Sequence, residues 1–86
     1  MNIINIINES FGGDVNDKRP LHINSMCRIA YCGYLKYYLN YSYKDVAFVT
    51  NASMGTAQDR LRKHRDFYSV DIGYKAIFDN IIQEIS

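Results

Sequence analysis

Hydrophobic residues recur along this chain at the spacing of amphipathic α-helices. Residues 2–10 predict a short helix with asparagines on its outer face, and Gly12 and Gly13 then supply the backbone freedom that a helix C-terminus requires. A loop is expected over residues 14–24. Residues 25–40 predict a helix that is apolar nearly all round, which is typical of a central helix. The expected inner face of the first helix is Ile3, Ile4, Ile7 and Phe11.

The next stretch predicts two helices joined by a short turn. Ser42 and Asp45 form an S-x-x-D capping box, which places the start of the first helix at Tyr43. Small and polar residues at positions 50–53 interrupt that helix, and the Ser53 hydroxyl can cap the second one. Local capping chemistry therefore predicts where both helices begin.

The second helix of this pair is expected over residues 53–66. Its apolar stripe follows the spacing i, i+4, i+7 and i+11 and consists of Ala57, Leu61, His64 and Tyr68. Its outer face is polar and basic and carries Thr56, Arg60, Arg62 and Lys63. Two helices, a short turn and a basic outer face are the outline of a helix-turn-helix over about residues 43–66. A helical hairpin with a solvated charged face fits the same pattern about equally well.

A break is expected over residues 66–69, followed by a last helix that Ser69 or Asp71 can cap. No alternation typical of a β-strand occurs between hairpin turns. We therefore expect a single all-α domain over residues 1–86, a small bundle of about five helices that contains a helix-turn-helix. The expected apolar stripe of the last helix is Tyr74, Ile77, Phe78, Ile81 and Ile85.

The charge of the chain is small in total but uneven along the sequence. The net charge is +1, yet residues 18–65 hold nine basic and two acidic residues, a net charge of +7, and the rest of the chain carries −6. A basic centre with acidic ends favours an anionic partner on one positive face. Helical bundles can also separate charge without binding anything.

The residues that usually carry catalysis or hold metals do not occur in recognisable patterns. Cys27 and Cys32 are five residues apart in one predicted helix and point to different sides, so we expect buried thiols and neither a zinc pair nor a disulfide. There is no phosphate-binding loop and no H-E-x-x-H motif, and the two histidines are far apart in sequence. We expect no enzyme activity, no metal and no cofactor.

The hydropathy of the chain gives an expectation about its location. No run of about 18 apolar residues occurs, which predicts no membrane span. The N-terminus has neither the basic region nor the cleavage site of a signal peptide. We therefore expect a cytoplasmic protein.

Four segments follow one another in a familiar order: IINIINESFGG, RIAYCGYLKYYLNYSYKDVAF, TAQDRLRK and YKAIFDNIIQEI. This order resembles the C-terminal DNA-binding domain of the bacterial replication initiator DnaA, a helix-turn-helix family of the Trp-repressor-like class. The third segment is similar to the family's recognition helix through Thr56, Ala57 and Lys63. The resemblance implies DNA binding and places Arg28 where the family has an arginine that reaches into the minor groove.

The chain departs from this family at the residues that read bases. The family's Gly-Gly-Arg-Asp-His-Thr-Thr-Val is NASMGTA here, reached with one residue fewer. Ser53, Met54 and Gly55 stand where the family has the Asp, His and Thr that contact bases. The basic loop, with Lys18 and Arg19, is shorter than in the family. The resemblance therefore supports the fold more strongly than any DNA sequence preference.

The function we expect is binding of double-stranded DNA by a replication or transcription accessory protein, such as one from a phage or mobile element. The N-terminal end of the 53–66 helix would enter the major groove, and Arg28 would hold the flanking groove. The expected contacts to bases or phosphates are Ser53, Thr56 and Gln58. The expected phosphate-neutralising residues are Lys18, Arg19, Arg60, Arg62 and Lys63.

Two other interpretations fit the same sequence. The same fold could bind a host replication or transcription protein, and the missing base-reading signature favours this alternative. The exposed tyrosines could instead form the interface of an oligomer. The charge asymmetry favours DNA.

Overall fold

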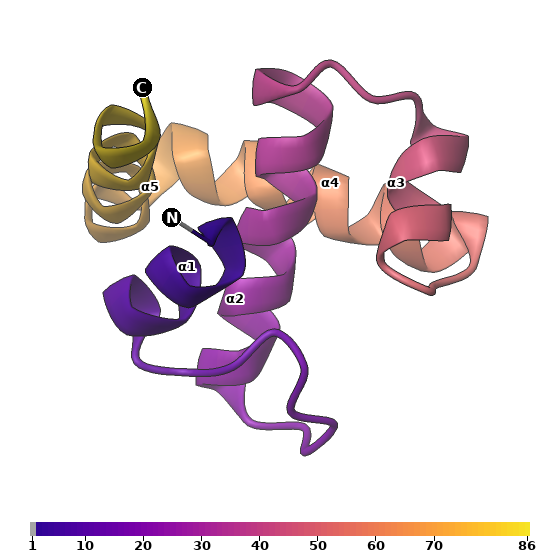
Figure 1. The fold of residues 1–86 in the computed structure, drawn as a ribbon, viewed down its shortest axis with the longest axis horizontal. Coiled ribbons are helices and arrows are strands. Elements are labelled where there is room, and N and C mark those ends of the chain that lie inside the picture. The colour runs from indigo at the N-terminus through magenta and orange to yellow at the C-terminus, as the bar shows by residue number, and fades with distance from the viewer. Residues whose placement is uncertain (1) are drawn as a thin grey trace.

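Helix α2 (His22–Gly33) runs through the middle of the molecule and continues into a π-helical turn, η1 (Tyr34–Tyr38) (Figure 1). The computed structural model describes residues 2–86. Within them the remaining helices are α1 (Ile3–Phe11), α3 (Tyr43–Val49), α4 (Met54–Val70) and α5 (Ile72–Ile85). α2 packs against α1 and α4, and α4 also packs against α3 and α5. The described chain contains helices and loops only, which confirms the prediction of a small all-α bundle.

The predicted helix starts are confirmed at the level of single hydrogen bonds. The Ser42 hydroxyl accepts from the Asp45 backbone N–H at 3.1 Å and caps α3. The Ser53 hydroxyl accepts from the Thr56 backbone N–H at 3.1 Å and caps α4. Gly12 ends α1 in the left-handed conformation, with a φ of 75°, where a side chain would be strained. Each of these caps involves only residues that are close in the sequence, so the sequence alone is enough to predict it.

Three predicted boundaries were wrong. α2 begins at His22 and not at residue 25, and its C-terminal end widens into η1, whereas a regular helix was expected through residue 40. α4 continues to Val70 and does not break at residues 66–69. It continues because the Phe67 ring packs on Tyr74 of α5, with their ring centroids 5.6 Å apart. Asp71, one of the two predicted caps, caps α5.

The first helix also differs from its predicted faces. The structure buries Ile6 and Ile7, whereas Ile3 and Ile4 are only partly covered. Asn8, expected on the outer face, ties down the loop after α1. Its side-chain oxygen accepts from the Val15 backbone N–H at 2.9 Å, and its side-chain nitrogen donates to Asp14 at 3.2 Å.

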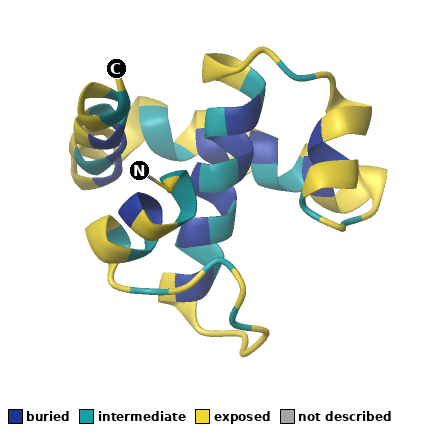
Figure 2. Cartoon of the chain, viewed as in Figure 1, coloured by how far each residue is buried: buried dark blue, intermediate teal, exposed yellow. Residues whose placement is uncertain are grey.

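Two clusters of buried side chains hold the helices together, and α2 contributes buried residues to both (Figure 2). Tyr31 and Tyr34 pack against both clusters, and Cys27 and Cys32 are buried free thiols, as predicted. The first cluster joins α1, α2 and α5 through Ile6, Ile7, Cys27, Ile29, Ala30, Tyr74, Phe78 and Ile81. The second joins α2, η1, α3 and α4 through Cys32, Leu35, Val46, Ala47, Ala57 and Leu61.

α2 and α4 pack closely where Gly33 meets His64. A Cβ atom at Gly33 would collide with the His64 imidazole ring, so only glycine fits there. The His64 ring is buried, and its Nδ1 lies 2.6 Å from the Tyr74 hydroxyl oxygen of α5. Burial lowers the pKa of His64 to about 4, because the charged form would lose its hydration. The predicted stripe on α4 therefore faces the core.

α3, the turn and α4 form a compact helix–turn–helix pair, as predicted. In the turn, Asn51 adopts a left-handed conformation with a φ of 53°, which asparagine tolerates better than most residues. The Thr50 hydroxyl donates to the Val46 carbonyl at 2.7 Å and closes the end of α3. None of the helices within residues 2–86 is long and apolar enough to cross a membrane.

Candidate nucleic-acid interface

The N-terminal end of α4 presents two exposed hydroxyl groups. The Ser53 hydroxyl donates to the Thr56 hydroxyl oxygen at 2.9 Å while it accepts from the Thr56 backbone N–H. Both hydrogen-bonding roles of Ser53 are therefore used within the cap. The Thr56 hydroxyl still has its own proton to donate to an outside acceptor such as a phosphate oxygen. Thr56 is thus the better placed of the two for a contact with DNA.

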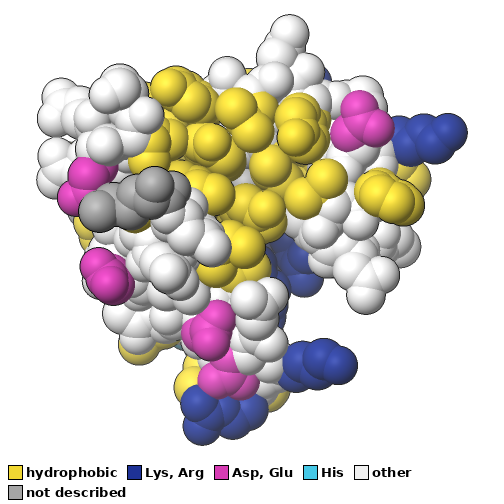
Figure 3. All heavy atoms as spheres, viewed as in Figure 1, with side chains coloured by type: hydrophobic (Ala, Val, Ile, Leu, Met, Phe, Trp, Pro, Cys, Tyr) yellow, Lys and Arg dark blue, Asp and Glu magenta, His cyan; other side chains and the backbone are white. Residues whose placement is uncertain are grey.

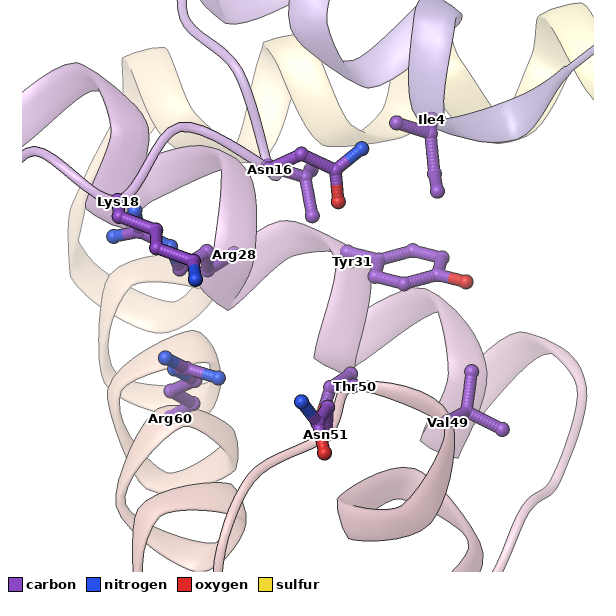
Figure 4. Close-up of a pocket in the computed structure, with 10 residues that line it drawn as sticks. Ile4, Asn16, Lys18, Arg28, Tyr31, Val49, Thr50, Asn51 and Arg60 are labelled. Carbon is purple, nitrogen blue, oxygen red and sulfur yellow. The ribbon is translucent and has the colours of Figure 1, made fainter.

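A hollow of about 330 Å³ opens beside α4, and three basic side chains form one of its walls (Figure 4). Lys18 comes from the loop before α2, Arg28 from α2 and Arg60 from α4. The residues that complete the hollow are polar or apolar: Ile4, Val15, Asn16, Tyr31, Val49, Thr50 and Asn51. The fold thus brings together cations from three separate segments of the chain.

A second, smaller hollow of about 110 Å³ lies between α2 and the first half of α4. Arg28 and Arg60 line this hollow as well as the larger one. Thr56, Lys63 and the acidic Asp59 also line it, so the surface that carries Arg28 and Arg60 extends to the α4 N-terminus. Five of the predicted contact residues therefore share one surface, the basic face: Lys18, Arg28, Thr56, Arg60 and Lys63.

The three basic side chains of the larger hollow have no acidic partner within residues 2–86. Lys18, Arg28 and Arg60 form no salt bridge with any residue in the described part of the chain. Arg28 donates to the backbone carbonyl of Asp17, which holds the loop against α2 without neutralising the guanidinium. This wall of the hollow is therefore positively charged.

The other predicted basic residues have acidic partners. Arg19 pairs with Asp17 at 2.6 Å, and hydrogen bonds from Arg19 lower the pKa of that carboxyl to about 2. On α4, Asp59 accepts from Arg62 at 2.6 Å and pairs with Lys63 at 3.1 Å. These pairs reduce the positive charge that Arg19, Arg62 and Lys63 offer to a ligand.

Gln58 and Arg62 lie on a different side of α4 from the basic face. They line a separate hollow, which they share with Tyr43 of α3 and with Gly55, Asp59 and Arg65 of α4. The structure thus separates these two predicted contacts from Lys18, Arg28 and Arg60.

Asn16, Thr50 and Asn51 border the larger hollow but were not among the predicted contact residues (Figure 4). Asn51 could have been found, because an asparagine between a helix and the next cap often takes the left-handed conformation of a turn. Asn16 had no such signal, since its position depends on how the loop folds back over α2.

Comparisons with protein-family models, with curated proteins and with solved structures found no match to this chain. The resemblance to the DnaA DNA-binding domain therefore stays a prediction. Within residues 2–86, no group of three or more His, Cys, Asp or Glu side chains is arranged to hold a metal ion.

Proposed function

We propose that this protein binds double-stranded DNA through the basic face. The observation that carries the proposal is the hollow in which Lys18, Arg28 and Arg60 meet with no salt bridge to a described residue. Cations that are held together by the fold and are not paired within it suit a polyanion with closely spaced charges. DNA is such a polyanion.

The position of α4 suggests how the duplex would lie. The N-terminal end of this helix carries free backbone N–H groups and the positive end of the helix dipole, and Thr56 stands in its first turn. With this end in the major groove, Arg60 and Lys63 would follow one phosphate strand. Lys18 and Arg28 would contact the backbone beside it.

Fluorescence anisotropy with a labelled duplex of about 20 base pairs tests this proposal through its salt dependence. Each phosphate contact adds about 0.9 to the slope of log affinity against log salt. Arg60→Gln should therefore weaken binding and lower the slope by about 1. Arg62→Gln is the matched control on the same helix, and it should change the slope much less because Asp59 and Asp66 already pair with Arg62.

Two results would contradict the proposal. The first is an absence of binding by the parent protein at about 50 mM salt and micromolar concentration, where even non-specific DNA binders register. The second is an equal loss of salt slope in Arg60→Gln and Arg62→Gln, which would show that the basic face is not the contact surface. Circular dichroism of both variants checks that the fold is unchanged.

One observation favours a protein partner as a second candidate function. Figure 3 shows a broad hydrophobic surface over the middle of the molecule, where α2 and η1 lie, and basic side chains lie at its edge. A host replication or transcription protein could cover such a surface. A pull-down from host lysate with and without nuclease separates the two candidates, because a DNA-bridged partner is lost on nuclease treatment and a direct protein partner is retained.

A further inference from the structure

Phe48 is the most exposed aromatic side chain in the described chain. It lies on α3 with 86% of its surface accessible to solvent. Asp45 lies one helical turn before it on the same side of the helix, exposed and with no salt-bridge partner among residues 2–86. Figure 3 shows hydrophobic side chains over α3 that stand apart from the central surface, next to acidic and basic side chains. Phe48 and Asp45 form a projecting aromatic group with a negative charge beside it.

A groove with aromatic walls lies elsewhere on the same chain, between η1, α4 and α5. Two adjoining hollows of about 480 and 430 Å³ share Tyr37, Tyr68 and Phe78 as lining residues. The buried His64 ring contributes to the wall, with its centroid 5.7 Å from that of Tyr37 and 4.6 Å from that of Phe78. We call this site the aromatic groove. Its rings pack on one another at the distances that aromatic contacts prefer, and Tyr37, which is 48% exposed, leaves part of its ring open to a further aromatic group.

The charges at the two ends of the aromatic groove differ. Arg65 lines one hollow and forms no salt bridge with a residue that the structure describes. Asp79 lines the other hollow, where it already accepts from the Tyr68 hydroxyl at 2.8 Å and pairs with Lys75 at 2.8 Å. The charged side chain without a salt-bridge partner is therefore Arg65, and it makes its end of the aromatic groove positive.

We infer that Phe48 of one copy of this chain inserts into the aromatic groove of a second copy, with its Asp45 against Arg65. The two halves of this contact are the projecting Phe48 with Asp45 and the aromatic groove with Arg65. They match in chemistry, because an exposed ring meets an aromatic wall and an unpaired carboxylate meets an unpaired guanidinium. Lys44, on the other flank of Phe48, would then lie toward the end that holds Asp79. The occupant is a second copy because this chain itself supplies both halves.

The two halves lie on different surfaces, so the contact is head-to-tail and each copy keeps one half free. Contacts of this kind build rings or open chains rather than closed dimers. One inserted side chain and one charge pair make a small interface, below the roughly 1,200 Å² of stable complexes. The association is therefore weak and depends on concentration.

Sedimentation velocity from about 10 μM to about 1 mM protein tests the inference in the range where weak contacts register. The sedimentation coefficient of the parent should rise with concentration, and that of Phe48→Ser should stay at the monomer value. Ile72→Ser is the matched control, because Ile72 is also 86% exposed but lies outside the aromatic groove. It should associate like the parent. A parent that stays monomeric at about 1 mM, or equal losses in both variants, would overturn the inference.

Charge exchange tests the orientation. Arg65→Asp should abolish association by facing Asp45 with a second negative charge, and the double variant Asp45→Arg, Arg65→Asp should restore it. A mixture of Phe48→Ser with the groove variant Tyr37→Ser should form dimers and nothing longer. The Phe48→Ser copy keeps only its groove and the Tyr37→Ser copy keeps only its Phe48, so one contact can form between them. Failure of the double variant to associate, or chains longer than two in the mixture, would contradict the head-to-tail contact. Circular dichroism confirms that each variant is folded.

Discussion

Lowering the pH should destabilise this protein through one buried side chain, His64. This residue is only 4% exposed, and its Nδ1 lies 2.6 Å from the Tyr74 hydroxyl oxygen. Burial lowers its pKa from an ordinary value of 6.5 to about 4. Between these two pH values the unfolded chain binds a proton that the folded chain does not. The free energy of unfolding therefore falls as the pH is lowered through this window.

The size of the effect follows from the two pKa values. They differ by about 2.5, and each pKa unit corresponds to about 1.36 kcal/mol, so the full loss is about 3 kcal/mol. Small domains have total stabilities of about 5–15 kcal/mol, so this is a substantial part. Most of the loss should be complete by about pH 4.5. Carboxylates with lowered pKa values, such as those of Asp59 and Asp79, act at lower pH, because they protonate below the ordinary carboxyl range.

Urea unfolding followed by circular dichroism at pH 7, 5.5 and 4.5 measures this loss. His64→Leu keeps an apolar side chain at the site and removes the titrating group, so its stability should be lower at pH 7 but nearly constant down to pH 4.5. His22→Gln is the control at the other histidine, which is exposed, and should keep the pH dependence of the parent. If His64→Leu lost as much stability as the parent between pH 7 and 4.5, the reasoning from burial would be refuted.

Three further substitutions test the packing. Leu61→Ala and Ile81→Ala each remove a fully buried side chain and should cost about 2–5 kcal/mol of unfolding free energy in urea titrations, so parent-like melting would show that the core is misassigned. Gly33→Ala should destabilise by about 1–3 kcal/mol because the new methyl group meets the His64 ring, although alanine normally stabilises a helix relative to glycine. Thermal unfolding of Gly33→Ala beside Gly55→Ala, where a Cβ meets nothing within 4 Å, isolates the collision.

The parts of the fold that depend on neighbouring residues could be predicted from the sequence. The caps at Ser42 and Ser53 and the stripe of Ala57, Leu61 and His64 follow from capping chemistry and helical periodicity, and the structure confirms them. The length of α4 could not be predicted in the same way. Residues 66–69 look like a helix break locally, and only the rings of α5 against Phe67 and Tyr68 explain why the helix continues.

The sequence also could not predict which basic side chains of the candidate interface are free of acidic partners. Counting along the sequence gave Arg19 the same weight as Lys18, because Asp17 lies just outside the basic stretch. In the structure Asp17 pairs with Arg19 and leaves Lys18 without a partner among the described residues. Sequence position therefore predicted which region is basic. Side-chain pairing, which depends on the folded loop, decides which cations face a ligand.

The two proposed surfaces involve separate side chains, so an experiment can refute one proposal without refuting the other. The basic face is built by the loop before α2, by α2 and by the first half of α4. Self-association would use α3, η1 and the second half of α4 with α5. Arg60→Gln should consequently change DNA affinity without changing sedimentation, and Phe48→Ser should abolish association while a single copy still contacts DNA. Phe48 and the larger hollow lie close together along the chain, because Val49, Thr50 and Asn51 border that hollow. A loss of DNA affinity in Phe48→Ser would therefore show that the two surfaces are coupled.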